Sequence, residues 1–257
     1  MPGDSFVHRL DPRTKIICSL VLLAAIMIAG NWPACLGIGL LLLSGILAAG
    51  IPGRILWRSL RPFWFVLLLT FLLQLFFTPG RTLYHLGPLH PTREGLVLGG
   101  QMLWRLTMFV ITGSLLTLTT SPLKLTAGLE SLCTPGKRFG LPVHELAMMM
   151  TIAVRFIPTL FAEAQLVIKA QQSRGADFTR GPFWKRAKGI LPLLVPLIAG
   201  SFRRAEELAT AMEARCYRGG IGRTRMEELK PGKGDAVALA ASALMLAVVI
   251  WLRRWGW

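Results

Sequence analysis

Five long apolar runs constrain the fold of this 257-residue chain more than any other feature. A helix rises 1.5 Å per residue, so runs of about 14 to 23 residues can cross a hydrocarbon core about 30 Å thick when flanking residues contribute. We therefore expect an all-α membrane protein with about five transmembrane helices. The runs cover residues 16–29, 34–51, 63–78, 96–118 and 236–252.

Composition excludes a soluble domain and a nucleic-acid-binding protein. Hydrophobic residues make up 53% of the chain, although its formal net charge is +16. The basic residues lie between apolar runs, not on strands studded with aromatic side chains, so they indicate an anionic membrane surface and not nucleic acid. The first apolar run lacks a convincing cleavage site, so we interpret it as a retained span.

The titratable residues predict neither a metal site nor a catalytic site. The four cysteines are widely spaced, and the pair His85 and His90 has no third ligand near it in the sequence. Neither a Ser-His-Asp order nor a phosphate-binding Gly-Lys loop is present in the sequence. We expect no catalytic residue, no metal and no cofactor.

The positions of the cations predict the orientation in the membrane. Arg9, Arg13 and Lys15 precede the first run, and three arginines fill the connection at residues 52–62, whereas residues 30–33 carry no cation. By the positive-inside rule the N-terminus is cytoplasmic. Five spans then place the C-terminus outside, and Arg253 and Arg254 fit that end poorly.

The chain divides into a four-helix membrane region at residues 1–119, a coupling region at 120–233 and a last membrane helix at 234–257. Of 29 Lys and Arg residues, 18 lie in residues 121–233. Apolar stretches in this region are interrupted by Arg155 and by prolines at 158, 192 and 196. We expect long amphipathic helices on the cytoplasmic side, with a re-entrant hairpin as the alternative.

Two arginine-centred segments, residues 172–175 and 213–216, end two similar helical stretches. One constant offset along the chain aligns Ile157 with Ile198, Phe161 with Phe202, Ala164 with Ala205, Ala170 with Ala211, and Arg174 with Arg215. This pairing indicates an internal repeat with two polar tips for a soluble partner. The alternative is that each arginine is an ordinary cation in the last turn of a helix.

Several motifs are distributed over nearly the whole chain: Asp11-Pro12-Arg13-Thr14-Lys15, Phe77-Thr78-Pro79-Gly80, Thr92-Arg93-Glu94-Gly95-Leu96, Phe139-Gly140-Leu141-Pro142, Arg155-Phe156-Ile157-Pro158, Ser173-Arg174-Gly175 and Ala214-Arg215-Cys216. Together they resemble the transmembrane T component of energy-coupling factor (ECF) transporters. This sequence departs from the family's usual Ala-Arg-Gly at Ser173 and at Cys216. Both arginines are retained, so only the role of the flanking residues is in question.

The resemblance implies a scaffold and coupling subunit of an ECF-type importer for vitamins or related micronutrients. Its expected partners are two ABC-type ATPase subunits, a substrate-binding membrane S component and the lipid bilayer. The ATPases would dock at Ser173, Arg174, Gly175, Ala214, Arg215 and Cys216. The S component would contact the apolar faces near Met148, Met149 and Leu194.

Two other function classes stay open at this point. A permease of a conventional ABC importer would itself line the translocation path, but generally has one coupling helix per chain. A membrane-embedded transferase would need acidic or histidine clusters at the membrane face, and the sequence lacks them.

Arg105, the single charge within an apolar run, is expected either to snorkel or to face a neighbouring span or partner. The small residues of run two can pack internally or receive another subunit.

Overall fold

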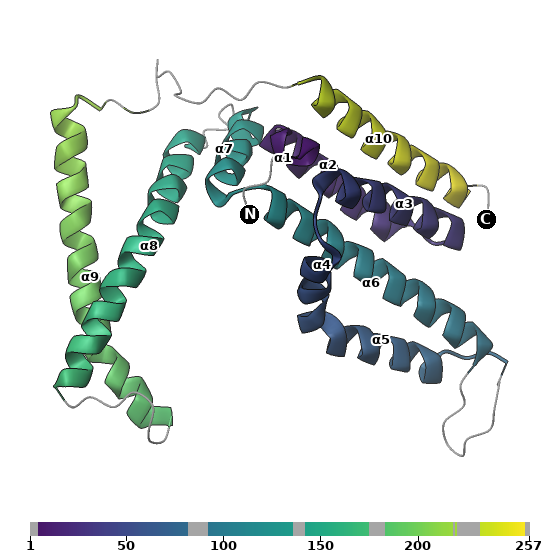
Figure 1. Ribbon diagram of the computed structural model, residues 1–257, viewed down its shortest axis with the longest axis horizontal. Coiled ribbons are helices and arrows are strands. Elements are labelled where there is room, and N and C mark those ends of the chain that lie inside the picture. The colour runs from purple at the N-terminus through teal and green to yellow at the C-terminus, as the bar shows by residue number, and fades with distance from the viewer. Residues whose placement is uncertain are drawn as a thin grey trace. The chain divides into compact units, whose positions relative to one another are not determined.

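The computed structural model describes residues 5–81, 92–135, 142–174, 183–217, 219 and 232–254. All secondary-structure elements of this described part are helices (Figure 1). They group into two compact units, one formed by Met1–Leu132 with Glu227–Trp257 and the other by Cys133–Met226. His85, His90 and Gly175 lie outside the described residues.

The first unit contains most of the helices. Its elements are α1 (Phe6–Arg9), α2 (Pro12–Ile28), α3 (Trp32–Ala49), α4 (Gly53–Leu60), the 3-10 turn η1 (Arg61–Phe63), α5 (Trp64–Phe77), α6 (Arg93–Thr119), α7 (Pro122–Cys133) and α10 (Lys233–Arg254). Helix α2 packs against both α6 and α10, while α3 and α5 pack on α6. The first and last long helices of the chain are therefore neighbours.

Local sequence signals explain where these helices begin and end. The Asp11 side chain accepts a hydrogen bond from the Arg13 amide at 2.9 Å, and Pro12 is the first residue of α2, as the sequence predicts. Thr92 caps α6 through the Gly95 amide at 3.0 Å. Gly50, with φ of 65°, ends α3 in the left-handed conformation that glycine adopts without strain.

The core of the first unit lies around α2. Apolar side chains of α2, α3, α6 and α10 form one buried cluster: Leu22, Ala25, Ile26, Ala29, Ala34, Cys35, Ile38, Leu42, Met108 and Val249. By contrast, α5 buries a single residue, Leu67, and leaves Phe65 71% and Phe77 79% exposed. Apolar surface of this extent suits hydrocarbon and not water.

Buried polar contacts bind three chain segments together at one end of this unit. The Asp11 amide donates to Asp235 Oδ1 at 2.9 Å, and both residues are buried. Lys15 Nζ donates to the carbonyl oxygens of His8 and Thr119, each at 3.1 Å. The start of α2, the end of α6 and the start of α10 therefore lie at the same end of the bundle.

The expectation of an all-α protein with about five membrane spans is confirmed. Five helical segments in the described part are long and apolar enough to cross a membrane: Trp32–Ala49, Gly53–Phe77, Arg93–Thr119, Val143–Ser173 and Gly234–Arg254. Four of them match predicted spans. The fifth, Val143–Ser173, is an additional segment, whereas the expected run at 16–29 lies in α2, whose 17 residues are fewer than those of any of the five.

The second unit contains two long helices, α8 (Val143–Ser173) and α9 (Phe183–Ala214). Pro158 lies inside α8, and Pro192 and Pro196 lie inside α9. The expectation of long helices in this region is confirmed, although prolines lie inside both of them. Each proline removes one backbone hydrogen bond, but neighbouring turns keep the helix continuous over 31 and 32 residues.

Arg105 contacts the C-terminal end of a neighbouring helix. Its Nη2 donates to the carbonyl oxygen of Ala29, directly after the last residue of α2. The carbonyls at a helix C-terminus have no partner in their own helix and carry partial negative charge, so a guanidinium is favourable there. Arg105 therefore joins α6 to the end of α2.

The small residues of α3 are used in part for internal packing. A Cβ atom on Gly37 would lie 2.7 Å from Met245 Cε of α10, and one on Gly39 would lie 2.8 Å from Trp104 of α6. Larger side chains at these two positions would push α3 away from its neighbours. Gly45 has no atom within 4 Å of such a Cβ, so this glycine is not used for close packing within the described chain.

Candidate functional site

Helices α8 and α9 contact each other through two residues that occupy equivalent positions of the internal repeat. Arg204 Nη2 lies 2.8 Å from Glu163 Oε2, and the offset that aligns Arg174 with Arg215 also aligns these two residues. Gly200 is buried at this crossing, where a Cβ atom would lie 3.1 Å from Glu163 Oε1. The crossing therefore combines an ion pair with a close approach of the two helices.

The two arginine tips lie at equal intervals along the chain from the Glu163–Arg204 ion pair. The interval along the chain from Glu163 to Arg174 is the same as the interval from Arg204 to Arg215. At 1.5 Å per residue each arm is about 16 Å long. The C-terminal ends of α8 and α9 lie at opposite ends of the crossed pair (Figure 1). The second unit thus presents two separate arginine tips.

Arg174 follows directly after the last residue of α8. Its amide donates to Gln171 O at 3.1 Å, and the Ser173 hydroxyl donates to Lys169 O at 3.1 Å. Both Ser173 and Arg174 are exposed. The Arg174 amide is hydrogen-bonded within the helix, and because the side chain is exposed, its guanidinium is available to another molecule.

Arg215 occupies the matching position after α9. The Tyr217 amide donates to Met212 O at 3.0 Å, and the Cys216 amide donates to Glu213 O at 2.8 Å. These two bonds form a Schellman motif, which requires a left-handed residue between the cap and the final donor. That residue is Cys216, with φ of +56°. Ala214, Arg215 and Cys216 are all exposed.

The apolar identities of the repeat also lie on the surface. Ile157 and Phe161 of α8 are 61% and 65% exposed, and the equivalent Ile198 and Phe202 of α9 are 52% and 71% exposed. Because the members of each pair are one helical turn apart, each pair lies on one side of its helix. We call the two rows the apolar strips: Leu146, Met149, Met150, Ile157 and Phe161 on α8, and Leu194, Val195, Ile198 and Phe202 on α9.

The residues predicted to contact a membrane partner lie on or beside these strips. Met149 is 54% exposed and Leu194 is 47% exposed, whereas Met148 is half-buried. Met148 therefore offers less surface than the other two predicted contacts. The sequence analysis did not predict that Ile198 and Phe202 are exposed, although both belong to the repeat.

Comparison with known proteins identifies the family. Residues 3–227 match the family model CbiQ, described as cobalt transport protein. The energy-coupling factor transporter transmembrane protein EcfT of Acidaminococcus fermentans is 52% identical over 99% of this chain and 95% of its own length. The EcfT of Thermosediminibacter oceani is 47% identical over 100% and 97%, and that of Heliobacterium modesticaldum is 49% identical over 98% and 95%. The chain belongs to the EcfT family.

Membership establishes the protein's class. It is a multi-pass membrane protein, the transmembrane coupling subunit of an ECF transporter, and a non-catalytic subunit. The family model's description mentions cobalt as transported cargo. Within the described ranges, His, Cys, Asp and Glu side chains form no group of three that could hold a metal ion.

Cys216 gives this EcfT protein a strained cap that a glycine would relax. A left-handed L-residue costs roughly 1 to 2 kcal/mol, and glycine gives back about 0.4 to 1 kcal/mol through the greater freedom of the unfolded chain. We expect Cys216→Gly to raise stability by about 0.5 to 1 kcal/mol, measured by thermal unfolding in detergent. Cys133→Gly is the matched control, because it removes an exposed thiol from a helical position and should destabilise. Shifts of the same sign in both variants would contradict this account.

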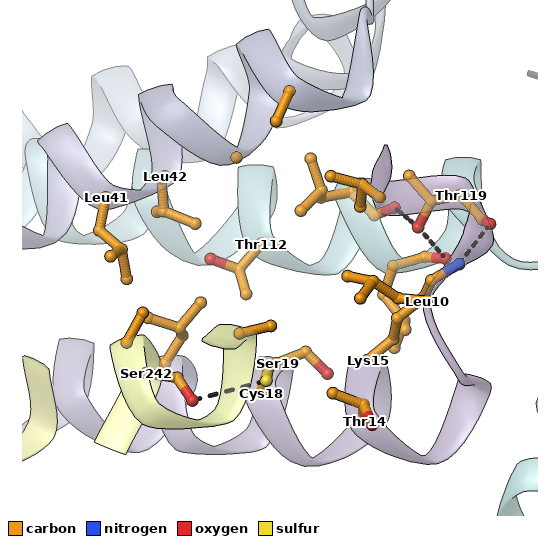
Figure 2. A pocket seen from close by; sticks show the side chains of 18 of the residues that line it. Leu10, Thr14, Lys15, Cys18, Ser19, Leu41, Leu42, Thr112, Thr119 and Ser242 are labelled. Atoms are coloured by element: carbon orange, nitrogen blue, oxygen red, sulfur yellow. Dashed lines mark hydrogen bonds between the residues drawn. The ribbon is translucent and has the colours of Figure 1, made fainter. Parts of the chain in front are cut away.

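A cavity of about 250 Å³ lies inside the first unit of this EcfT protein (Figure 2). Leucines line much of it, and Lys15 lies at one end beside Thr119. The hydroxyls of Ser19, Thr112 and Ser242 line it too, but each already donates to a carbonyl of its own helix. A hydrophilic solute would find few free donors on these walls, so the cavity is a poor translocation path.

Proposed function

We propose that α8 and α9 are the coupling helices of this EcfT protein and that each arginine tip binds one ABC-type ATPase subunit. The docking residues are Ser173, Arg174 and Gly175 at the first tip and Ala214, Arg215 and Cys216 at the second. The observation that carries this proposal is that two exposed arginines end α8 and α9 at equal chain intervals from the Glu163–Arg204 ion pair. An ordinary helix cap would not require this equality. A guanidinium suits such docking because its planar fork makes two charge-assisted hydrogen bonds at once.

The apolar strips support a second partner, a substrate-binding membrane S component. They leave aromatic and aliphatic side chains about half exposed or more on both helices. Exposed apolar rows of this kind on a membrane-associated helix pair match another apolar surface. Movement of the ATPases at the arginine tips would reach the S component through the same two rigid helices.

We also propose that residues 120–233 and the N-terminus are cytoplasmic. The contacts of Lys15 with Thr119 and of Asp11 with Asp235 support this, because the segment leaves and rejoins the bundle at the end where α2 starts. Arg9, Arg13 and Lys15 give that end its positive charge. On this arrangement α8 does not cross the membrane, although its length and composition would allow it.

The resemblance to ECF transporters implies a vitamin or related micronutrient as cargo, and we propose that the S component captures it and not this chain. A permease function, in which the chain lines the path itself, is less well supported. The walls of the first-unit cavity are largely apolar, and the hydroxyls of Ser19 and Thr112 already donate within their own helices.

Purification of the tagged protein from native membranes in mild detergent tests the proposed function. We expect two ATPase polypeptides and one small apolar membrane protein to co-purify. The exposed thiols of Cys133 and Cys216 report orientation in the same cells, because Cys35 is buried and Cys18 is half-buried. An impermeant maleimide should label them only after permeabilisation, and a Cys133→Ser/Cys216→Ser variant gives the background. Co-purification of a soluble solute-binding protein, or labelling from outside, would refute the assignment.

A further inference from the structure

The short helix α4 and its C-cap present a row of three arginines without acidic partners. Arg54, Arg58 and Arg61 are spaced by four and then three positions, so they share one side of the helix. All three are exposed. The sequence contains no Asp or Glu between Asp11 and Glu94, and no ion pair to these arginines occurs among the described residues. This row is a concentrated positive charge that nothing in the described chain neutralises.

An apolar groove opens directly beside this row. It has a volume of about 240 Å³, and its walls come from α4, η1, α5 and α6. The lining includes Trp57, Leu60, Arg61, Trp64, Leu68 and Leu103. Thr107 also lines it, but its hydroxyl donates to Leu103 O at 2.7 Å, so the wall stays apolar. Arg61 thus belongs both to the arginine row and to the groove.

The two tryptophans place this groove at the boundary of the membrane. Trp57 is 65% exposed and Trp64 is 58% exposed, and indole rings favour the headgroup level of a bilayer. Helix α5 continues from there with Phe65 and other apolar side chains exposed. The groove therefore has a cationic rim at headgroup level and apolar walls that lead toward the hydrocarbon.

We propose that this groove binds one anionic phospholipid, with its phosphate at the arginine row and an acyl chain along the groove. The charge row selects an anionic headgroup, because the cation of a zwitterionic headgroup would face three arginines. The apolar walls select a ligand with a hydrocarbon chain, so a free phosphate compound would leave them unfilled. This site is separate from the arginine tips and does not depend on the proposed docking of ATPases.

Native mass spectrometry of the full-length protein, with any subunits that co-purify, tests this proposal. The probes are phosphatidylglycerol and phosphatidylcholine with identical acyl chains. We expect the wild type to retain one phosphatidylglycerol in clear excess over phosphatidylcholine. Arg58→Gln/Arg61→Gln should lower that excess about tenfold or more, since each cation near the surface contributes to the attraction. Arg253→Gln/Arg254→Gln, which removes two exposed arginines from the end of α10, should keep it.

A second variant separates the groove from the general effect of charge. Leu103→Trp fills the groove and leaves all arginines in place, so it should also reduce retention of phosphatidylglycerol. If the wild type and Arg58→Gln/Arg61→Gln retained phosphatidylglycerol equally, the headgroup site would be overturned. If the α10 control lost as much phosphatidylglycerol as Arg58→Gln/Arg61→Gln, the effect would come from net charge and not from this site. Unchanged retention in Leu103→Trp would overturn the acyl-chain site. If a cross-linker placed at Trp64 captured a partner polypeptide, and phosphatidylglycerol showed no excess over phosphatidylcholine, the groove would bind protein instead of lipid.

Discussion

Arg174→Ala/Arg215→Ala is expected to abolish ATPase co-purification and substrate uptake while the membrane subunit stays folded. Loss of one partner from a buried charge-assisted pair costs about 2 to 5 kcal/mol, which weakens binding at least tenfold at each tip. Each single alanine variant should weaken assembly, and Arg→Lys should restore it only in part, because an ammonium lacks the planar fork. The measurements are ATPase recovery and uptake in the same membranes.

A matched control for this variant is available on the same helices. Arg155→Ala/Arg203→Ala removes one exposed arginine from α8 and one from α9, away from both tips. It should leave ATPase recovery unchanged. If the arginines at the tips were only helix caps, each alanine there would cost about 0.3 to 1 kcal/mol and the ATPases would stay attached. Wild-type recovery and uptake in the double tip variant would therefore remove the docking role.

Met149→Asp/Leu194→Asp is expected to release the S component and leave the ATPases bound. Burying an unpaired polar or charged group at an apolar interface costs about 3 kcal/mol or more, a weakening of at least about 100-fold. Both positions are about half exposed in the free chain, so the changes should not disturb folding. Quantification of each partner after affinity purification gives the result.

The apolar exchange Met149→Leu/Leu194→Met is the control for this second experiment. It conserves volume and hydrophobicity, so the S component should remain bound. Loss of both partners in the aspartate variant would indicate misfolding, which a changed thermal unfolding profile would reveal. Retention of the S component with two aspartates would mean that its contact lies outside the apolar strips.

Hydrophobic runs predict the membrane helices well because a bilayer demands long apolar segments. The runs at residues 34–51, 63–78, 96–118 and 236–252 correspond closely to α3, α5, α6 and α10. The sequence did not predict α4 as a helix, because its eight residues include two arginines and contain too short an apolar pattern. Its signal was the arginine spacing at 54, 58 and 61, which places the charges on one side.

Long helices were predicted for the coupling region, but their packing against each other was not. Pro158, Pro192 and Pro196 favour breaks, yet α8 and α9 continue through them. The internal repeat predicted the paired arginines, but not that Glu163 and Arg204 would meet at the crossing. Nor can a sequence pattern show that Cys216 adopts a left-handed backbone, since that conformation belongs mainly to glycine.

The pairing of α2 with α10 has a consequence for synthesis of the chain. Val249 completes the core that contains Leu22 and Ile26, and Asp235 accepts from the buried amide of Asp11. The earliest long helix to leave the ribosome therefore keeps an unfinished face until the last helix of the chain emerges. A nascent chain that stops before α10 already carries both arginines and both apolar strips, but its first unit still lacks the helix that completes the core.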